Sequence, residues 1–322
     1  MALWLNEDEI VACLSMEDAI AALREAFADP KAQVLPRWRG RGERAQYSVM
    51  AAALPGLGIC GLKQYMGGAG RTRFVVLVHD MNTGELLGLL EADHLGRIRT
   101  GAASGLATDL LARPDAEVFG CIGAGGQAAT QVAAVLAVRP GIREVRVYSR
   151  TPERAQAFAA RIGERARAVA SAEEAVRGAD IVTTITNARA PVLEGRWLGE
   201  GCHVNGAGSN VDGHAELDAE AVRRCSAIFA DNVPGARTEC GDLIQAGVDW
   251  SQVHELGDLV AGRVPGRRAR GDITLFESQG IALEDVAAGA AALKVARARG
   301  IGREVAFGEG RDGAPMPAQS RG

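Results

Sequence analysis

The sequence lacks a strong charge of one sign and has no sustained basic stretch. Its 322 residues carry a formal net charge of −4. The densest basic cluster, residues 267–270, lies in a segment that also contains glycine and proline. Because nucleic-acid-binding surfaces gather lysine and arginine on one face, this composition argues against a nucleic-acid partner.

Long apolar runs are absent as well. No stretch reaches the roughly 18 apolar residues expected of a membrane-spanning helix. Residues 1–9 lack the basic segment that opens a secretory signal. We therefore expect no membrane association and a cytoplasmic location.

The six cysteines lack the spacing of metal ligands. They form no C-x-x-C pair and have no histidine at ligand spacing. Several, including Cys121, lie in apolar segments that suit reduced thiols in a protein core. We expect neither a metal site nor disulfides.

Glycine, in contrast, is abundant, with 41 residues. The apolar run 117–122 leads into Gly123-Ala-Gly-Gly-Gln-Ala128, a G-x-G-x-x-A pattern that precedes a helix-forming stretch. The first glycine allows a tight turn, the second lets backbone N–H groups approach a pyrophosphate, and the helix N-terminus favours negative charge. A purely structural strand–turn–helix corner is the alternative. The predicted cofactor contacts in this turn are Gly123, Gly125, Gly126 and Gln127.

The next predicted strand, 145–149, indicates which dinucleotide is bound. It ends in Ser149, Arg150 and Thr151, with no acid before Glu153. NAD-binding units usually place an acid here to bind the ribose hydroxyl, whereas a guanidinium and hydroxyls suit a 2′-phosphate. We predict NADP(H), with NAD(H) less favoured. Alternatively, Arg150 is a solvated loop residue.

Alternating strand and helix patterns after residue 113 predict an α/β fold with a Rossmann-type, doubly wound parallel sheet. We expect this dinucleotide-binding domain to span residues 113–299. The candidate strands are 118–122, 145–149, 166–170, 180–186, 202–205, 227–230 and 273–276.

Residues 1–112 show a different order of predicted elements, with several strands in succession, which predicts an N-terminal α+β domain. Strands are expected at 47–54, 58–66, 74–79 and 86–91, a helix follows Ser15, and another covers 100–112. A C-terminal helix at about 300–310 is expected to join this domain. The alanine-rich helix 283–299 could also pack on it, and residues 308–322 are expected to be disordered.

Ligands in such sheets bind beyond the carboxyl ends of the strands. Segments 184–187 and 206–210 are rich in small and hydroxyl residues, as a nicotinamide ribose site would be. The predicted contacts there are Thr184, Thr186 and Ser209.

Two cations of the first domain are candidates for chemistry. Lys63 alternates with apolar neighbours, so it is either functional or exposed on an open sheet face. Arg99 precedes Thr100, a plausible helix start, where a guanidinium and free N–H groups would bind an anion. An ordinary surface charge is the alternative for Arg99.

Seven motifs together resemble the ornithine cyclodeaminase/mu-crystallin family over about residues 10–305. The resemblance implies Rossmann-type proteins, usually homodimers, with an N-terminal substrate-binding and dimerisation domain. It also implies hydride exchange at the α-carbon of a small amino or imino acid. The motifs are Gly123–Ala128, Arg97–Ala102, Gly61–Lys63, Ala179–Thr184, Glu216–Asp218, Glu239–Asp242 and Asp272–Phe276.

The resemblance also implies roles for individual residues. Arg37, Lys63 and Arg99 would grip the substrate carboxylate, and Lys63 would assist proton movement at the α-nitrogen. Arg99 and Thr100 would also approach the cofactor phosphates.

One departure concerns Asn210, which stands where the family's cyclodeaminases carry a catalytic aspartate. An amide cannot accept a proton, so we favour an NADP(H)-dependent imine or ketimine reductase or amino-acid dehydrogenase. The alternatives are an ornithine-type cyclodeaminase and a catalytically silent NADPH-binding protein. Met50, Tyr65 and Val75 are candidates for the pocket walls, and the sequence leaves open whether each faces inward or outward. Few acids are expected near the substrate.

Overall fold

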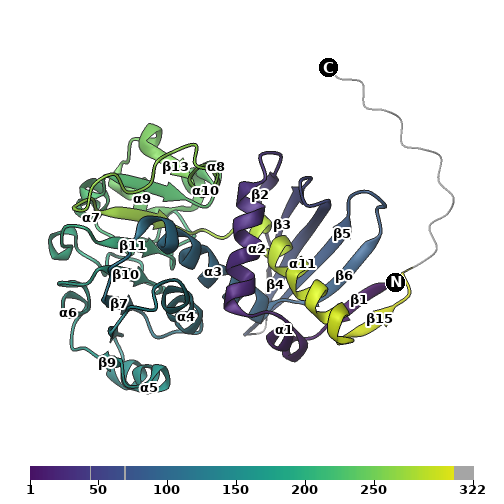
Figure 1. Ribbon diagram of the computed structural model, residues 1–322, viewed down its shortest axis with the longest axis horizontal. Helices are drawn as coiled ribbons and strands as arrows, with labels where there is room; N and C mark the ends of the chain where they lie inside the picture. Colours follow the sequence, from purple (N-terminus) through teal and green to yellow (C-terminus); the bar gives the residue numbers. More distant parts are fainter. Residues whose placement is uncertain (44, 69, 308–322) are drawn as a thin grey trace.

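The computed structural model describes residues 1–43, 45–68 and 70–307. Two β-sheets stand apart in the molecule, and helices fill the space between them (Figure 1). The first sheet is built mainly from the N-terminal part of the chain, and the second from the middle and later part. Within the described ranges, no helix is long and apolar enough to cross a membrane.

The first sheet has seven strands in the order β15-β1-β6-β5-β4-β3-β2. Its central strands pair antiparallel, whereas β1 runs parallel to β6. The four strands expected from the sequence are present, and three further strands extend the sheet. The bounds are β1 Ala2–Leu5, β2 Gln33–Arg41, β3 Ala45–Leu54, β4 Ile59–Gly68, β5 Arg71–Asp80, β6 Leu86–Glu91 and β15 Arg303–Val305.

Helix α11 (Ala282–Arg299) packs on one face of this first sheet. A Cβ on Gly88 of β6 would lie 2.4 Å from Leu293 of the helix, so the glycine permits close contact. The expected helix at 300–310 is wrong, because β15 forms there and pairs with β1. Gly300, with a left-handed φ of 65°, ends α11 and turns the chain into that strand. The predicted disorder of 308–322 lies outside the described residues.

Helices α1 (Glu7–Cys13), α2 (Met16–Ala28) and α3 (Asp93–Leu111) complete the region around the first sheet. The Ser15 side chain accepts a hydrogen bond from the Asp18 backbone N–H at 3.0 Å, as the cap pattern predicts.

Helix α3 begins seven residues before the expected start, so the placement of Arg99 at a helix N-terminus is wrong. The Thr100 hydroxyl is not a cap, because it donates to the carbonyl of Gly96 at 2.8 Å within the helix. The true N-terminus is capped from a distance: the Glu7 carboxylate accepts from the backbone N–H groups of Asp93 and His94 at 2.7 and 2.8 Å. A cap supplied from another helix leaves no local sequence signal.

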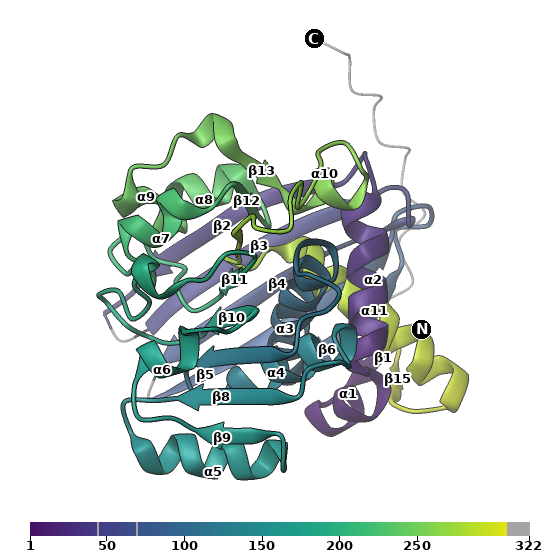
Figure 2. The same cartoon turned by 60° about the vertical axis from the view of Figure 1, so that its left-hand side comes forward.

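The second sheet has eight strands in the order β13-β12-β14-β11-β10-β7-β8-β9, and its paired strands are parallel (Figure 2). The prediction of a doubly wound parallel sheet is confirmed. The strands are β7 Val118–Ile122, β8 Glu144–Tyr148, β9 Ala166–Ala168, β10 Ile181–Thr184, β11 His203–Gly206, β12 Ala227–Ala230, β13 Val253–Glu255 and β14 Thr274–Glu277. The helices are α4 Ala128–Val138, α5 Pro152–Ile162, α6 Ala172–Val176, α7 Ala219–Arg224, α8 Val233–Glu239, α9 Gly241–Ala246 and α10 Leu256–Val260.

Helices α3 and α4 pack against each other between the two sheets. They pack closely at Gly101, where a Cβ would lie 2.5 Å from the carbonyl oxygen of Thr130. Gly101 therefore serves helix packing, and its neighbour Arg99 is carried on α3 to the gap between the sheets.

Candidate functional site

A cavity of about 660 Å³ lies between the two sheets. Its lining includes the glycine turn after β7, the segment after β10, and side chains from β2, β4 and α3. Both halves of the molecule therefore contribute to one site, at the switch point where such sheets bind ligands.

The glycine turn forms an open cradle in this cavity. Gly123 has a φ of 128°, and a Cβ there would lie 2.3 Å from the Ile185 carbonyl oxygen. No atom lies within 4 Å of a Cβ built on Gly125, so the space above the turn is free. Gly126 and Gln127 also line the cavity, and α4 begins at the next residue. This geometry suits a dinucleotide pyrophosphate.

At the end of β8, the candidate cofactor contacts Ser149 and Arg150 line the same cavity, and Arg154 of α5 joins them. Thr151 does not line it. Its backbone N–H donates to the Ser149 Oγ at 3.3 Å. Two arginine residues, Arg150 and Arg154, therefore line the cavity beyond the end of β8.

Arg97 is a cavity-lining cation that the sequence reasoning missed. Its Nη1 is 3.7 Å from the position of a Cβ on Gly126, so the guanidinium lies near the glycine turn. Arg97 pairs with Asp93 at 2.6 Å. Among lining residues in the described part of the chain, Asp93 carries the one carboxylate, which agrees with the expected scarcity of acids at the cavity surface.

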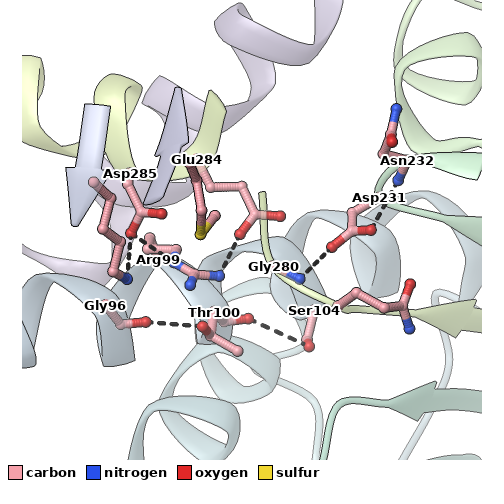
Figure 3. Close-up of polar contacts among 12 residues, drawn as sticks. Gly96, Arg99, Thr100, Ser104, Asp231, Asn232, Gly280, Glu284 and Asp285 are labelled. Carbon is pink, nitrogen blue, oxygen red and sulfur yellow. Dashed lines mark hydrogen bonds and ion pairs between the residues drawn. The ribbon is translucent and has the colours of Figure 1, made fainter. Parts of the chain in front are cut away.

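Lys63 and Arg99 lie together in the cavity wall and share a buried carboxylate. The Oδ1 atom of Asp285 accepts from Lys63 Nζ at 2.8 Å and from Arg99 Nε at 3.0 Å (Figure 3). Arg99 Nη1 also donates to Glu284 at 2.6 Å. Lys63 is thus not exposed on an open sheet face, since only 3% of its surface is accessible, and it lines the cavity.

Arg37 of β2 completes a group of three buried cations. Its Nη1 pairs with the Glu239 carboxylate at 2.7 Å, and its Nη2 donates to the carbonyl of Gln279 at 2.8 Å. Arg39, two residues later, pairs with the same carboxylate. The sequence did not predict that Glu239, Glu284 and Asp285 are the partners of these cations.

The buried charges shift one another's pKa. Burial lowers the pKa of Lys63 to about 8, and the nearby Arg99 and Arg37 add to the effect while Asp285 opposes it. For Asp285, burial would raise the pKa, but Arg99 and Lys63 together outweigh burial and lower it. Burial, reinforced by Asp231 and Asp285, raises the pKa of Glu284 to about 8. The two neighbouring acids of α11 therefore have pKa values shifted in opposite directions.

The apolar wall beside Lys63 consists of Met50, Tyr65 and Phe74. Val75, whose direction the sequence leaves open, does not line the cavity. Successive strand residues face opposite sides, so Phe74 faces the cavity and Val75 points to the other face of the sheet. The Lys63 ammonium lies 5.4 Å from the centroid of the Phe74 ring.

Two hydroxyl residues predicted to contact the cofactor do not reach the cavity. Thr184 is fully buried at the end of β10, and the Ser209 hydroxyl donates to the His214 carbonyl at 2.6 Å. Thr186, Asn210 and Thr100 do line the cavity. Thr184 is the last residue of strand β10, so its side chain is still packed within the sheet and does not reach the cavity.

A comparison with known families matches residues 3–298 to the ornithine cyclodeaminase/mu-crystallin family. A Δ1-pyrroline-2-carboxylate reductase of Bacillus cereus is 39% identical over 242 residues, which are 72% of this chain and 74% of that protein.

Two solved structures are similar over almost their whole length. That of Thermococcus litoralis Δ1-pyrroline-2-carboxylate reductase, in complex with NADH and L-proline, has a TM-score of 0.88 and 34% identity, and covers 94% of this chain and 100% of its own. An archaeal alanine dehydrogenase dimer with bound NAD has a TM-score of 0.88 and 31% identity, covering 95% and 99%. The resemblance of the motifs is confirmed, and the chain belongs to the ornithine cyclodeaminase/mu-crystallin family.

Proposed function

We propose that this protein is an NADP(H)-dependent oxidoreductase that exchanges hydride at the α-carbon of a small imino or amino acid, acting as an imine or ketimine reductase or amino-acid dehydrogenase. The observation that carries the proposal is one cavity that holds both an open glycine turn and three buried cations. Arg37, Lys63 and Arg99 suit a substrate carboxylate, and the turn suits a dinucleotide. Relatives named as Δ1-pyrroline-2-carboxylate reductases support this function.

Side chains of this chain would orient the substrate and move its proton. Arg37 and Arg99 would hold the carboxylate and so fix the α-carbon, which lowers the barrier by removing freedom of motion. When bound, the nicotinamide ring exchanges the hydride. Lys63 would give a proton to the imine nitrogen while the α-carbon gains the hydride, so that C=N becomes CH–NH. The lysine then regains a proton from solvent.

The apolar wall suggests the kind of substrate side chain. Met50, Tyr65 and Phe74 lie next to the lysine, and they offer contact to a small ring or alkyl group. We propose a cyclic imine carboxylate of the Δ1-pyrroline-2-carboxylate type as the substrate class, in accord with the names of the relatives.

We propose NADPH as the preferred cofactor because Arg150, Arg154 and Ser149 line the cavity beyond β8. The related structures with bound NADH or NAD leave this preference open. NADPH should bind more tightly than NADH to the wild type, and Arg150→Asp should reverse or remove the difference. A charged hydrogen bond of about 1.5–3 kcal/mol corresponds to roughly tenfold or more in Kd. Equal Kd values for the two cofactors in the wild type would contradict the proposal.

We also propose that two copies of the chain pair through the open face of the first sheet. In-register residues Leu35, Ala51, Leu62, Leu77 and Leu89 form an apolar row across five strands. This row faces away from α11, because the alternate residues Met50, Val76 and Leu90 are the buried ones. The dimer of the related alanine dehydrogenase supports this assembly.

The activity is tested by following NADPH absorbance with cyclic imines, pyruvate plus ammonia or methylamine, and ornithine. Net NADPH consumption with an imino acid indicates a reductase. Ammonia release from ornithine without net cofactor change would indicate a cyclodeaminase, and tight binding without turnover would indicate a silent binding protein.

A further inference from the structure

We propose that Asp285 is the positioning residue of the site: it fixes the Lys63 ammonium against the Arg99 guanidinium and keeps the lysine charged for proton donation. Its use in catalysis rests on the proposed reductase function. The shared carboxylate itself is a feature of the fold and can be tested without turnover.

The geometry concentrates two contacts on a single oxygen. Asp285 Oδ1 accepts from Lys63 Nζ at 2.8 Å and from Arg99 Nε at 3.0 Å. Figure 3 shows the Asp285 carboxylate beside the Arg99 guanidinium. Asp285 comes from α11, Lys63 from β4 and Arg99 from α3, so one atom sets the distance between cations that belong to different elements. The Asp285 side chain has no accessible surface, and water cannot replace it.

The surroundings of Lys63 explain why the carboxylate is needed. The nearby charged groups are Arg99 on α3, Arg37 on β2 and Asp285 on α11, while β5 contributes the Phe74 ring. Two of these three charges are positive and repel a lysine ammonium. Burial already lowers the pKa of Lys63 to about 8, with Asp285 as the opposing charge. Without that charge, the lysine would lose its proton at a lower pH.

The neighbouring Glu284 has a different role, although it lies beside Asp285 in the chain. It accepts from Arg99 at 2.6 Å, and its hydrogen bonds in the described residues do not include Lys63. Burial raises its pKa to about 8, whereas the pKa of Asp285 is lowered. Glu284→Gln therefore removes a second buried carboxyl group that bonds Arg99 and not Lys63, and it provides a matched control.

The variant Asp285→Asn removes the charge with little change in shape. Its amide oxygen can still accept from Lys63 and Arg99. Its NH₂ group would occupy the place of Oδ2, which has no hydrogen-bond partner in the described part of the chain. The full-length variant is therefore expected to fold, and circular dichroism checks this.

Lysine titration measures the effect directly, because the sequence contains only Lys31, Lys63 and Lys294. In the full chain with lysine labelled by carbon-13 at Cε, three NMR signals are expected, and Lys63→Met identifies the signal of Lys63. Its midpoint should fall by about one pH unit or more in Asp285→Asn, the effect of losing an adjacent opposite charge. In Glu284→Gln it should stay within about half a unit of wild type. Equal midpoints in all three proteins would overturn the proposal.

A parallel measurement separates this inference from the proposed function. With Δ1-pyrroline-2-carboxylate and saturating NADPH, the alkaline limb of kcat/KM should move to lower pH in Asp285→Asn, with a loss of roughly fivefold or more at pH 8 that recovers at pH 6. A loss that is the same at every pH would indicate a structural defect and overturn the positioning role. If the lysine midpoint shifts but the wild type does not oxidise NADPH, the proposed function fails and the charge coupling stands. If Asp285→Asn does not fold, Asp285→Ser carries the same expectations.

Discussion

At the scale of single residues, Asn210 bears most directly on the choice between reduction and cyclisation. It lines the cavity, and its backbone carbonyl accepts a hydrogen bond from Arg39 at 3.1 Å. Ring closure of ornithine needs a group that takes a proton from the side-chain amine and returns it, and an amide does neither near neutral pH.

We expect negligible ammonia release from ornithine by the wild type with NAD supplied, as measured in a coupled ammonia assay. Asn210→Asp restores a carboxylate of nearly the same size and is the informative comparison. Robust proline formation by the unmodified protein would overturn the reductase function in favour of a cyclodeaminase.

Arg99 illustrates how the site and the core share residues. Arg99→Ala would remove activity, and it would also leave Glu284 and Asp285 buried without their guanidinium partner. Breaking a buried ion pair from one side typically costs about 3–5 kcal/mol. We expect a loss of unfolding free energy of that order at neutral pH, measured by urea unfolding.

The loss of unfolding free energy caused by Arg99→Ala should become smaller as the pH falls. In the wild type the pKa of Asp285 is lowered, because Arg99 and Lys63 outweigh burial, so its stabilisation is present above the unfolded pKa of about 4 and is lost in acid. In Arg99→Ala, burial of Asp285 would be opposed by Lys63 alone, so the pKa of Asp285 would rise above the unfolded value, and its protonation between about pH 7 and pH 4 would relieve the variant. A difference in unfolding free energy between the wild type and Arg99→Ala that stays constant from pH 7 to pH 4 would contradict this explanation of the pKa of Asp285.

At the scale of secondary-structure elements, Gly101 sets the approach of α3 to α4. A Cβ there would lie 2.5 Å from a backbone oxygen of Thr130, which cannot move away cheaply. Gly101→Ala should destabilise the fold by about 1–3 kcal/mol through overpacking, although alanine favours helices by about 1 kcal/mol. Gly213→Ala is the control, because no atom lies within 4 Å of its Cβ, and a change within about 0.5 kcal/mol is expected. Equal thermal unfolding of the two variants would refute the packing role.

The elements that the sequence predicted are those with local signals. The glycine turn and the apolar strands of the second sheet could be predicted because turn chemistry and hydrophobic pattern act over a few residues. The start of α3 could not, since its cap is Glu7, 86 residues away. Strand β1 was missed because its partners, β6 and β15, are distant in the sequence.

At the site, too, the contacts that could not be predicted join residues far apart in the sequence. Lys63 and Arg99 could be suspected as cations in unusual places, but their carboxylate partner is separated from them by 222 and 186 residues. The signal that could have pointed to it is the pair Glu284-Asp285, two acids in an otherwise alanine-rich helix. Only the fold of α11 onto the first sheet brings the pair to the cations.

At the scale of the whole molecule, the apolar row on the first sheet predicts a dimer. The wild type should have twice the chain mass of 33.6 kDa in light scattering after size-exclusion chromatography. Leu77→Arg, which places a charge in the middle of the row, should shift the protein to the monomer mass. Met81→Arg, in the exposed turn after β5, is the control and should remain dimeric. A wild-type monomer, or a dimer unaffected by Leu77→Arg, would contradict the proposed face.

The central claim is that one cavity between the two sheets brings a bound carboxylate and a nicotinamide together for hydride exchange at the α-carbon. The most direct measurement uses NADPH that carries deuterium at both C4 positions of the ring, with Δ1-pyrroline-2-carboxylate as substrate and mass spectrometry of the amino acid formed. The account predicts one deuterium at the α-carbon of proline for each NADPH oxidised, and no such product from Lys63→Met or Arg99→Ala. Proline without deuterium, or no product from the wild type despite bound NADPH, would contradict it.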